Sequence, residues 1–417
     1  MGKILLYSRK PMKSNKKLNI VMTMGILFIL SSILNYNLSI NPEYSNDRSE
    51  YSDNINLDKD NLQLSKVSGI IHIDNNWSAV KAAGICTGNG TYSDPYVIED
   101  LVITTFPESG ILIENSSAYL RIENCSIGHA AQPNAGIELV NVNNSHIINN
   151  DCTQNYHGIY LRYCNNNTIS GNKASDTEGS GYTLAIGILL ENCHNNIVSG
   201  NTANYSGDGG IHLSTCDNNV ISGNTANNCE GGFAILLSDC ENNIVSGNTA
   251  NDVGTPPWNV GLFTNDGIGI IGSENNIITG NIINGNVRAG ISLIDSNDNT
   301  ISRNTANNNQ YGIWLRWDNS NNVVFENTIN GNSHHGIFLN DQSNYNFIAG
   351  NILSGNGICI EELYCFGNIY WNNGLCIYVG APYFEILIIS GVVGIIIITV
   401  VFLGVRRRKS FRKETNP

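Results

Sequence analysis

A short apolar phrase recurs along the chain at regular intervals. Gly-Ile-x-Leu, or a close variant, occurs eleven times, from residue 110 to residue 357, in steps of roughly 23 residues. Between these copies lies a second phrase, Asn-Asn-x-Ile-Ser-Gly-Asn-Thr-Ala, with clear copies starting at Asn195, Asn218 and Asn242. Both phrases alternate apolar and polar positions with a period of two and are bounded by Asn and Gly. This pattern predicts short strands separated by tight turns, with no segment in the unit long enough for a helix.

Strands this short need neighbours to form stably. If successive units stack in register, every backbone group finds a partner one turn above and one turn below, at the spacing of about 4.8 Å between paired strands. We therefore predict an all-β fold, a right-handed parallel β-helix over residues 67–380. It would be a single-stranded solenoid of about 11 or 12 turns, with three short strands in each turn.

The two ends of the chain carry different signals. Residues 1–40 combine basic residues with an apolar stretch, which is typical of a signal peptide or an uncleaved signal anchor, and residues 41–66 read as a disordered polar linker. Residues 386–405 are an uncharged apolar run long enough for a transmembrane helix. The basic tail at 406–417 would then be cytoplasmic, which places the β-helix outside the cell and anchors it in the cell membrane.

Composition and charge narrow the choice of partners. Asn accounts for 67 of the 417 residues and Gly for 42, and both tolerate the left-handed backbone conformation that tight turns require. Residues 41–385 hold 10 Lys and Arg against 34 Asp and Glu, a formal charge of −24. Such a body repels phosphate backbones, so nucleic acid is excluded as a partner, whereas cations and neutral glycans are not.

The repeat phrases and the segment GNGTYSDPYVIEDLVI at residues 88–103 resemble the right-handed β-helix repeat proteins of archaea. That group includes the family described as periplasmic copper-binding or NosD-type, and the resemblance covers roughly residues 68–375. It implies the fold, and the family label suggests a role in handling copper. The function stays open, because the same fold also hosts pectate lyases, polygalacturonases, carbohydrate epimerases and adhesins.

Two units carry insertions before their Gly-Ile-x-Leu phrase, at residues 175–185 and 251–266. They would rise as two walls around a floor formed by residues 205–209 and 228–232. The predicted groove gathers acidic and aromatic residues: Asp176, Glu178, Tyr182, Tyr205, Asp208, Glu230, Asp252, Trp258 and Asp266. Such a set suits glycan recognition, and two carboxyls such as Asp208 and Glu230 would suit sugar hydrolysis. Acidic loop residues are also expected from the composition of this body alone.

Cysteines recur at one position of the repeat, five residues after its Ile: Cys164, Cys193, Cys216 and Cys240. One hypothesis is a soft-metal site for Cu(I), which the family label also suggests. The interpretation that we favour is a column of small apolar side chains pointing inward. Near the end of the repeats, one disulfide is expected among Cys359, Cys365 and Cys376.

Two further patterns concern surface chemistry. Asp217, Glu241 and Glu274 occupy one turn position on three consecutive units, where they would bind Ca²⁺ or act as solvated turn residues. The motifs at residues 160–163 (Tyr-x-Arg-Tyr) and 314–317 (Trp-x-Arg-Trp) alternate aromatic and Arg side chains. This pattern suits contact with a glycan or a partner protein, and an Arg packed over a ring explains it equally well.

Three functions are compatible with the sequence. We favour a non-enzymatic rod on the cell surface, without a cofactor, that recognises glycans or cell-surface proteins. The alternatives are a carbohydrate-active enzyme, a hydrolase or lyase, in the predicted groove, and an exported protein that handles copper. Eight Asn-x-Ser/Thr sequons would allow glycosylation of an exported chain.

Overall fold

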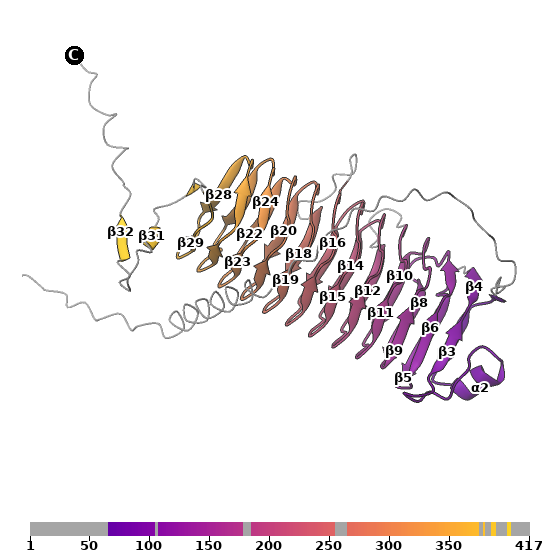
Figure 1. The fold of residues 1–417 in the computed structure, drawn as a ribbon. Helices are drawn as coiled ribbons and strands as arrows, with labels where there is room; N and C mark the ends of the chain where they lie inside the picture. The colour runs from indigo at the N-terminus through magenta and orange to yellow at the C-terminus, as the bar shows by residue number, and fades with distance from the viewer. Residues whose placement is uncertain are drawn as a thin grey trace, which may run out of the picture. The chain divides into compact units, whose positions relative to one another are not determined.

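Stacked parallel strands dominate the chain (Figure 1). The computed structural model describes residues 66–104, 107–177, 185–254, 265–374, 378–379, 385–388 and 398–401. Up to residue 379, the described residues form a parallel β-solenoid of about 11 turns, which confirms the predicted all-β architecture. Equivalent residues pair across successive turns, as Ile159 does with Ile188 and Ile188 with Ile211. The stacking is therefore in register.

The Gly-Ile-x-Leu phrases form a 13-stranded sheet. Its strands, in order, are β2 (Ile71–Asp74), β5 (Ile111–Ser116), β8 (Ala135–Val142), β10 (His157–Arg162), β12 (Ile186–Glu191), β14 (Gly209–Ser214), β16 (Phe233–Ser238), β18 (Asp266–Ile271), β20 (Ala289–Ile294), β22 (Tyr311–Arg316), β25 (His335–Asn340), β28 (Ile358–Leu363) and β30 (Tyr378–Val379).

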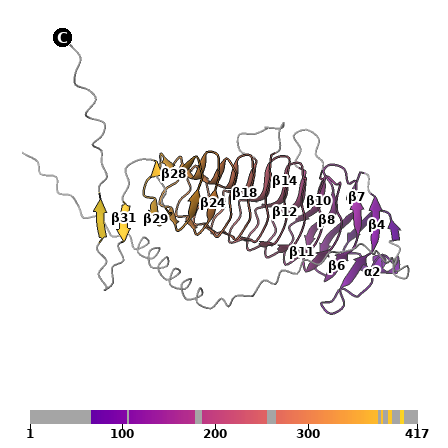
Figure 2. The same cartoon turned by 45° about the horizontal axis from the view of Figure 1, so that its top comes forward.

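The Asn-Asn-x-Ile-Ser phrases form a 12-stranded sheet. Its strands are β3 (Tyr96–Glu99), β6 (Leu120–Glu123), β9 (Ser145–Ile148), β11 (Thr168–Ser170), β13 (Ile197–Ser199), β15 (Val220–Ser222), β17 (Ile244–Ser246), β19 (Ile277–Thr279), β21 (Thr300–Ser302), β23 (Val323–Phe325), β26 (Phe347–Ala349) and β29 (Ile369–Trp371). Figure 2 shows the strands of both sheets following one another along the stack.

The third side of each turn is shorter than predicted. Through the middle of the solenoid it consists of single bridges, such as Thr202 to Thr225, and Asn201 and Ala203 on either side of Thr202 are buried in the interior. Regular strands occur on this side only near the ends: β1 (Lys66–Ser68), β4 (Leu101–Thr104), β7 (Ser126–Gly128), β24 (Thr328–Asn330) and β27 (Ile352–Ser354).

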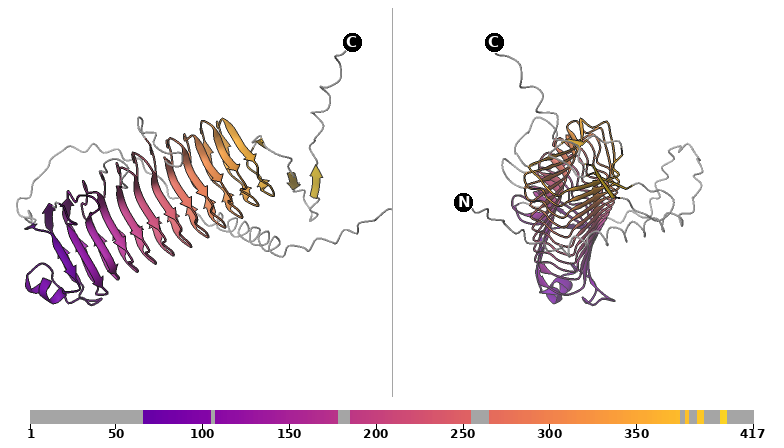
Figure 3. Two further views of the ribbon diagram at one scale, coloured as in Figure 1. Left: turned by 180° about the vertical axis from the view of Figure 1, so that it is seen from behind. Right: turned by 90° about the vertical axis from the view of Figure 1, so that its left-hand side faces the viewer.

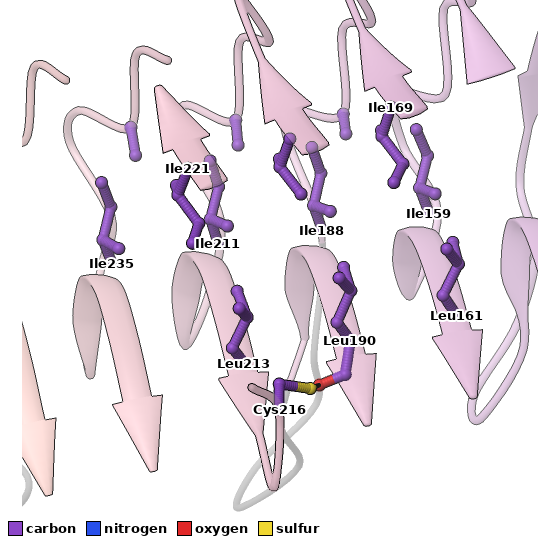
Figure 4. Packing of buried hydrophobic residues seen from close by; sticks show 14 of the residues in the cluster. Ile159, Leu161, Ile169, Ile188, Leu190, Ile211, Leu213, Cys216, Ile221 and Ile235 are labelled. Atoms are coloured by element: carbon purple, nitrogen blue, oxygen red, sulfur yellow. Dashed lines mark hydrogen bonds between the residues drawn. The ribbon is translucent and has the colours of Figure 1, made fainter. Parts of the chain in front are cut away.

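Straight columns of aliphatic side chains fill the interior. Ile159, Ile188, Ile211 and Ile235 come from four successive strands of the 13-stranded sheet and lie in one row (Figure 4). Ile221 of the 12-stranded sheet lies against the same row. All five are fully buried, so stacking produces one continuous hydrophobic core although no single turn could bury its own apolar face.

Asn has two roles, of which the sequence predicted only one. The first Asn of each Asn-Asn pair, such as Asn195, has the left-handed conformation expected of a turn residue. The second is buried, and its amide bonds to the neighbouring turn: Asn196 Oδ1 accepts the backbone N–H of Asn167 at 2.9 Å, and the N–H of Asn196 donates to Asn219 Oδ1 at 2.8 Å. A second ladder of this kind runs from Asn150 to Asn373. These ladders satisfy backbone groups where the chain turns inside the protein.

A short helix, α2 (Trp77–Ala82), lies near the N-terminal end of the solenoid (Figures 1 and 3). Trp77 stacks on Tyr96 at a centroid distance of 4.4 Å and donates a hydrogen bond to Ser116 Oγ at 2.9 Å. The helix is therefore packed against the first turns. Residues 88–103 contribute β3 and most of β4, and so belong to the first turn.

The predicted signal segment 1–40, the linker up to residue 65 and the basic tail lie outside the described residues. Of the predicted transmembrane segment 386–405, the structure describes parts of two short strands, β31 (Glu385–Ile388) and β32 (Ile398–Val401), which pair antiparallel. Their Ile and Val residues are β-branched and favour strands, and an apolar run alone does not distinguish strand from helix. No helix in the described part of the chain is long and apolar enough to cross a membrane.

Candidate functional site

The two carboxyls proposed as a catalytic pair, those of Asp208 and Glu230, lie on successive turns of the solenoid. Asp208, just before β14, is half-buried and accepts the backbone N–H of Ala185 at 3.1 Å. Burial raises the pKa of Asp208, and the negative charge of Glu230 on the next turn raises this pKa further. Glu230 is exposed. A half-buried carboxyl beside an exposed one has the asymmetry that an acid and base pair requires.

The other groove residues are more dispersed. Glu178, Tyr182 and Trp258 lie outside the described residues. Asp176, Tyr205 and Asp252 all have the left-handed turn conformation at one corner of the solenoid. Backbone hydrogen bonds place Asp176 beside the turn that contains Tyr205, whereas Asp252 is two turns beyond Tyr205. The described part of the predicted groove is therefore a corner lined by separate residues, among which Asp208 is affected by the charge of Glu230 on the next turn.

Asp266 has a different environment, at the start of β18 on the outer face of the 13-stranded sheet. Its carboxylate is fully buried and accepts two hydrogen bonds from the guanidinium of Arg288, one of them from Nε at 2.7 Å. The backbone N–H of Ala289 at 2.9 Å and the hydroxyl of Ser292 at 2.5 Å also donate to it. A buried carboxylate with this many donors is held in place by a charged network.

Aromatic and guanidinium groups adjoin this network on β22. The Tyr311 and Trp314 rings are stacked with centroids 4.4 Å apart, and the Arg316 guanidinium lies 4.7 Å from the centre of the Trp314 ring. Trp314 Nε1 donates to Asn340 Oδ1 at 2.8 Å. Arg316 is only 2% exposed, and burial together with the charge of Arg288 lowers its pKa to about 10. The Trp-x-Arg motif therefore does pack Arg over a ring, on the outer face.

The next two strands complete this site. The His335 ring stacks on Phe338, with centroids 4.6 Å apart, and its Nε2 lies 2.5 Å from Glu361 Oε2. His335 also lies parallel to Tyr311 at 5.4 Å. We call the whole set the Trp314 cluster: Asp266, Arg288, Ser292, Tyr311, Trp314, Arg316, His335, Phe338 and Glu361.

Sequence reasoning found Trp314, Arg316 and, for another reason, Asp266, but it missed most of this cluster. The missed strand residues share a signal, because they lie two positions before, or one position after, an Ile that pairs in register from turn to turn, such as Ile313, Ile337 and Ile360. Ser292, for example, follows Ile291 directly. In the structure the repeat Ile is buried, and side chains from these two positions contact each other on the outer face, as Tyr311 and Trp314 do, so writing the repeats as aligned columns would have brought the cluster into view.

A second cluster surrounds the other predicted motif, on β10. The Tyr160 hydroxyl donates to the Glu191 carboxylate. Burial raises the pKa of Tyr160 above its usual range, and this hydrogen bond raises it further. The Arg162 guanidinium lies 5.7 Å from the centre of the Tyr160 ring and 3.9 Å from Glu138 Oε1. The two motifs thus form similar polar and aromatic groups on the same outer face.

Two buried histidines lie on this face, in β10 and β14. Burial lowers the pKa of His157 and that of His212 to about 4, so both rings are neutral at pH 7. His157 Nδ1 accepts the N–H of Ile186 at 3.3 Å, and His212 Nε2 donates to the carbonyl oxygen of Phe233 at 3.1 Å. The His212 ring packs over Gly209, where a Cβ would lie 2.0 Å from Nε2. Gly at this position therefore makes room for the ring.

The cysteine column is internal and sealed from solvent. Each of its four thiols is fully buried, and Cys193 Sγ is typical: it accepts the N–H of Cys164 at 3.3 Å and donates to the carbonyl oxygen of Leu161 at 3.4 Å. Ser273 and Ser296 continue the same column. Within the described ranges, no three His, Cys, Asp or Glu side chains are grouped to hold a metal ion. The thiols do not fit a copper site, and they pack as small side chains.

The remaining candidate metal ligands and cysteines make contacts with their immediate neighbours. Asp217 Oδ1 accepts the N–H of Glu241 at 2.8 Å, and Glu274 Oε1 lies 3.4 Å from the Asn297 amide, so these carboxylates bond along the column instead of converging on one point. The Ca²⁺ site remains a prediction. Cys359 is disulfide-bonded, whereas Cys365 is a free, buried thiol.

Solved structures with similar folds include several that are described as polysaccharide-active. The periplasmic alginate epimerase AlgG is 15% identical, with 73% of this chain and 85% of that chain covered and a TM-score of 0.48. The A-module of the mannuronan C-5 epimerase AlgE6 of Azotobacter vinelandii is 15% identical, with 70% and 92% covered and a TM-score of 0.47. An exopolygalacturonase from Thermotoga maritima is 12% identical, with 66% and 83% covered and a TM-score of 0.42. Likeness this low carries no argument about the activity of this chain.

Family models match most of the solenoid, whereas no curated protein matches the chain. The model described as "Right handed beta helix region" matches residues 60–186 and 109–264. The model described as "Periplasmic copper-binding protein (NosD)" matches residues 258–385. With the parallel in-register stacking of the strands, these matches identify the chain as a right-handed parallel β-helix repeat protein of the NosD type.

Proposed function

We propose that this chain is an exported β-helix protein that binds glycans at the Trp314 cluster without converting them. The observation that carries this proposal is the pairing of two guanidiniums, those of Arg288 and Arg316, with the Tyr311 and Trp314 rings on one outer face. Basic residues are scarce in this acidic body, so two guanidiniums at one site are not expected from composition alone. Sugars offer C–H groups that contact aromatic rings and hydroxyls that bond to guanidinium and carboxylate groups.

The hydrogen bonding of the cluster favours binding over catalysis. A general acid or base must exchange a proton with the substrate, and its carboxyl must reach the reacting atoms. Asp266 is fully buried and already accepts hydrogen bonds from Arg288, Ala289 and Ser292. Glu361 is held by His335. These carboxylates therefore serve to orient their neighbours.

Glycoside hydrolysis at the corner formed by Asp208 and Glu230 is a second candidate. It is supported by the raised pKa of Asp208, which suits a proton donor, and by the exposure of Glu230, which suits a base or nucleophile.

Location outside the cytoplasm, with a membrane anchor, is also part of the proposal. It is supported by the basic and apolar N-terminal sequence, by the apolar run at 386–405 with basic residues after it, and by the disulfide at Cys359. The description of the NosD family as periplasmic agrees with export.

The test is a glycan array probed with the full-length chain in detergent, followed by calorimetry of any glycan that binds. Trp314→Ala is expected to weaken binding at least tenfold, because it removes the ring at the centre of the cluster. Trp371→Ala, which truncates a half-buried Trp on the 12-stranded sheet, serves as the matched control. Melting temperatures of both variants separate lost binding from lost folding.

The outcomes distinguish the candidates. No bound glycan, or equal weakening by both Trp variants, would overturn the binding proposal. Release of shortened glycan by the wild-type chain, abolished in Asp208→Asn, would establish hydrolysis instead.

A further inference from the structure

The outer face of the 12-stranded sheet carries an apolar stripe. We use this name for Ile197, Val220, Ile244 and Ile277, which are paired in register on four successive strands, β13, β15, β17 and β19. Ile197 is 44% exposed, Ile244 38% and Ile277 41%, whereas most aliphatic side chains of the solenoid are fully buried. Single exposed apolar residues are common on proteins, but a continuous row is characteristic of an interaction surface.

The two outward columns of this face carry no charge, whereas the turn that precedes the stripe holds Asp217, Glu241 and Glu274. The parallel outward column, two residues further along each strand, holds only Ser or Thr from Ser170 to Thr279. Neither column contains a charged residue anywhere from β11 to β29. The face becomes charged only towards the N-terminal end, at Arg121 and Glu123 on β6. A neutral, partly apolar face thus extends over nine strands of a strongly acidic body.

We infer that this face docks a second copy of the same chain. Two copies repel each other through their negative charge, so close approach is favourable only where both surfaces are neutral. The columns run parallel to the solenoid axis because the turns are in register, so a copy related by a two-fold axis presents the same columns to its partner. Apolar side chains of one copy then lie against those of the other.

The size of the face suits the core of a dimer interface. Nine strands at about 4.8 Å spacing extend over roughly 38 Å. With a width of roughly 10 Å for a three-residue strand, the uncharged columns measure roughly 400 Å², about half of the 800 Å² that each partner buries in a standard interface, and the flanking turns would form its polar rim. This inference concerns the opposite sheet from the Trp314 cluster and does not depend on glycan binding.

The test is the oligomeric state of the full-length chain in detergent, measured by sedimentation velocity over a range of protein concentrations. The wild type is expected to be a dimer. The double variant Ile244→Lys/Ile277→Lys places charges in the middle of the face and is expected to weaken dimerisation at least tenfold. Both side chains are well exposed, so the fold should survive, and circular dichroism on heating checks this.

Ile282→Lys is the matched control, because Ile282 is 47% exposed but lies on the third side of the solenoid, between Thr249 and Thr305. It is expected to leave the dimer unchanged. A monomeric wild type would overturn the inference. So would a dimer that the double variant leaves intact, for example one held together by residues 386–405.

Discussion

The outer faces of the two long sheets share one scaffold and differ in chemistry. On the 13-stranded sheet, the column that follows the repeat Ile changes from turn to turn, with Tyr160, Leu189, His212 and Leu236 on successive strands. On the 12-stranded sheet, the corresponding outward column is uniformly Ile or Val from Ile197 to Ile277. One face therefore has distinct local sites, and the other has a repeated surface.

This contrast shows where information about function lies in a solenoid. Inward positions repeat because each must pack against the turn above and the turn below, as Ile188 does between Ile159 and Ile211. Outward positions are free of that constraint. Variation among outward residues suits a site for one ligand, whereas uniformity suits an extended partner with the same period.

The largest expected effect is at Asp266. Asp266→Ala removes the buried carboxylate that holds Arg288 and Ser292, and loss of one member of a buried charged network costs about 3 kcal/mol or more. The free energy of unfolding, measured by urea denaturation, should fall by this amount. Ser246→Ala on the other face should change it by less than about 0.5 kcal/mol. A similar loss of unfolding free energy in both variants would contradict the difference proposed between the outer faces of the two sheets.

Acid should also destabilise the outer face of the 13-stranded sheet more than that of the 12-stranded sheet. In the folded chain the pKa values of His157 and His212 are about 4, below the ordinary value of 6.5, so between pH 6.5 and pH 4 the unfolded chain binds more protons. Stability therefore falls as the pH drops through this window, by about 2 kcal/mol for each ring at pH 5. Urea denaturation at pH 7 and pH 5 measures the loss.

His212→Asn should remove about half of this dependence on pH. The matched variant His146→Asn changes an exposed ring on the 12-stranded sheet and should keep most of the pH dependence of the wild type. Equal pH dependence in the wild type and His212→Asn would show that this ring is not held neutral by burial.

The repeats were sufficient to predict the fold, because inward residues such as Ile211 and Leu213 recur with the period of the solenoid. They did not reveal the Asn ladders. Asn195 and Asn196 are adjacent residues of the same type, yet Asn195 forms the turn and Asn196 hydrogen-bonds to the next turn in the interior. Composition cannot separate these roles, since the difference depends on which side of the backbone each side chain occupies.

The candidate site was predicted only in part, and for physical reasons. Trp314 and Arg316 are two residues apart, so the period of a strand alone puts them on one face. Asp266 and Arg288 are 22 residues apart and meet only because one full turn separates them. Asp266 also ends an inserted segment, and so the sequence grouped it with the acidic groove residues instead of with its partner.

A single replacement on each face gives a smaller but cleaner comparison. Ser292→Val removes a hydroxyl that donates to a buried carboxylate, which is worth about 1.5 kcal/mol or more. Ser222→Val changes a half-buried hydroxyl on the 12-stranded sheet and should alter the free energy of unfolding by less than about 0.5 kcal/mol. Urea denaturation of the two variants under the same conditions measures both values. If Ser222→Val were the more harmful, the roles assigned to the two faces would be reversed.

The smallest effect concerns Tyr160. Tyr160→Phe keeps the ring under Arg162 and removes only the hydroxyl that donates to Glu191, so the free energy of unfolding should fall by about 1 kcal/mol. Tyr345→Phe, at an exposed tyrosine beside the 12-stranded sheet, should have no measurable effect. Ultraviolet titration gives a second readout, because burial and Glu191 raise the pKa of Tyr160. The variant should lose one tyrosine that ionises above the ordinary range. If it lost a tyrosine that ionises in the ordinary range instead, the hydroxyl of Tyr160 would be open to solvent.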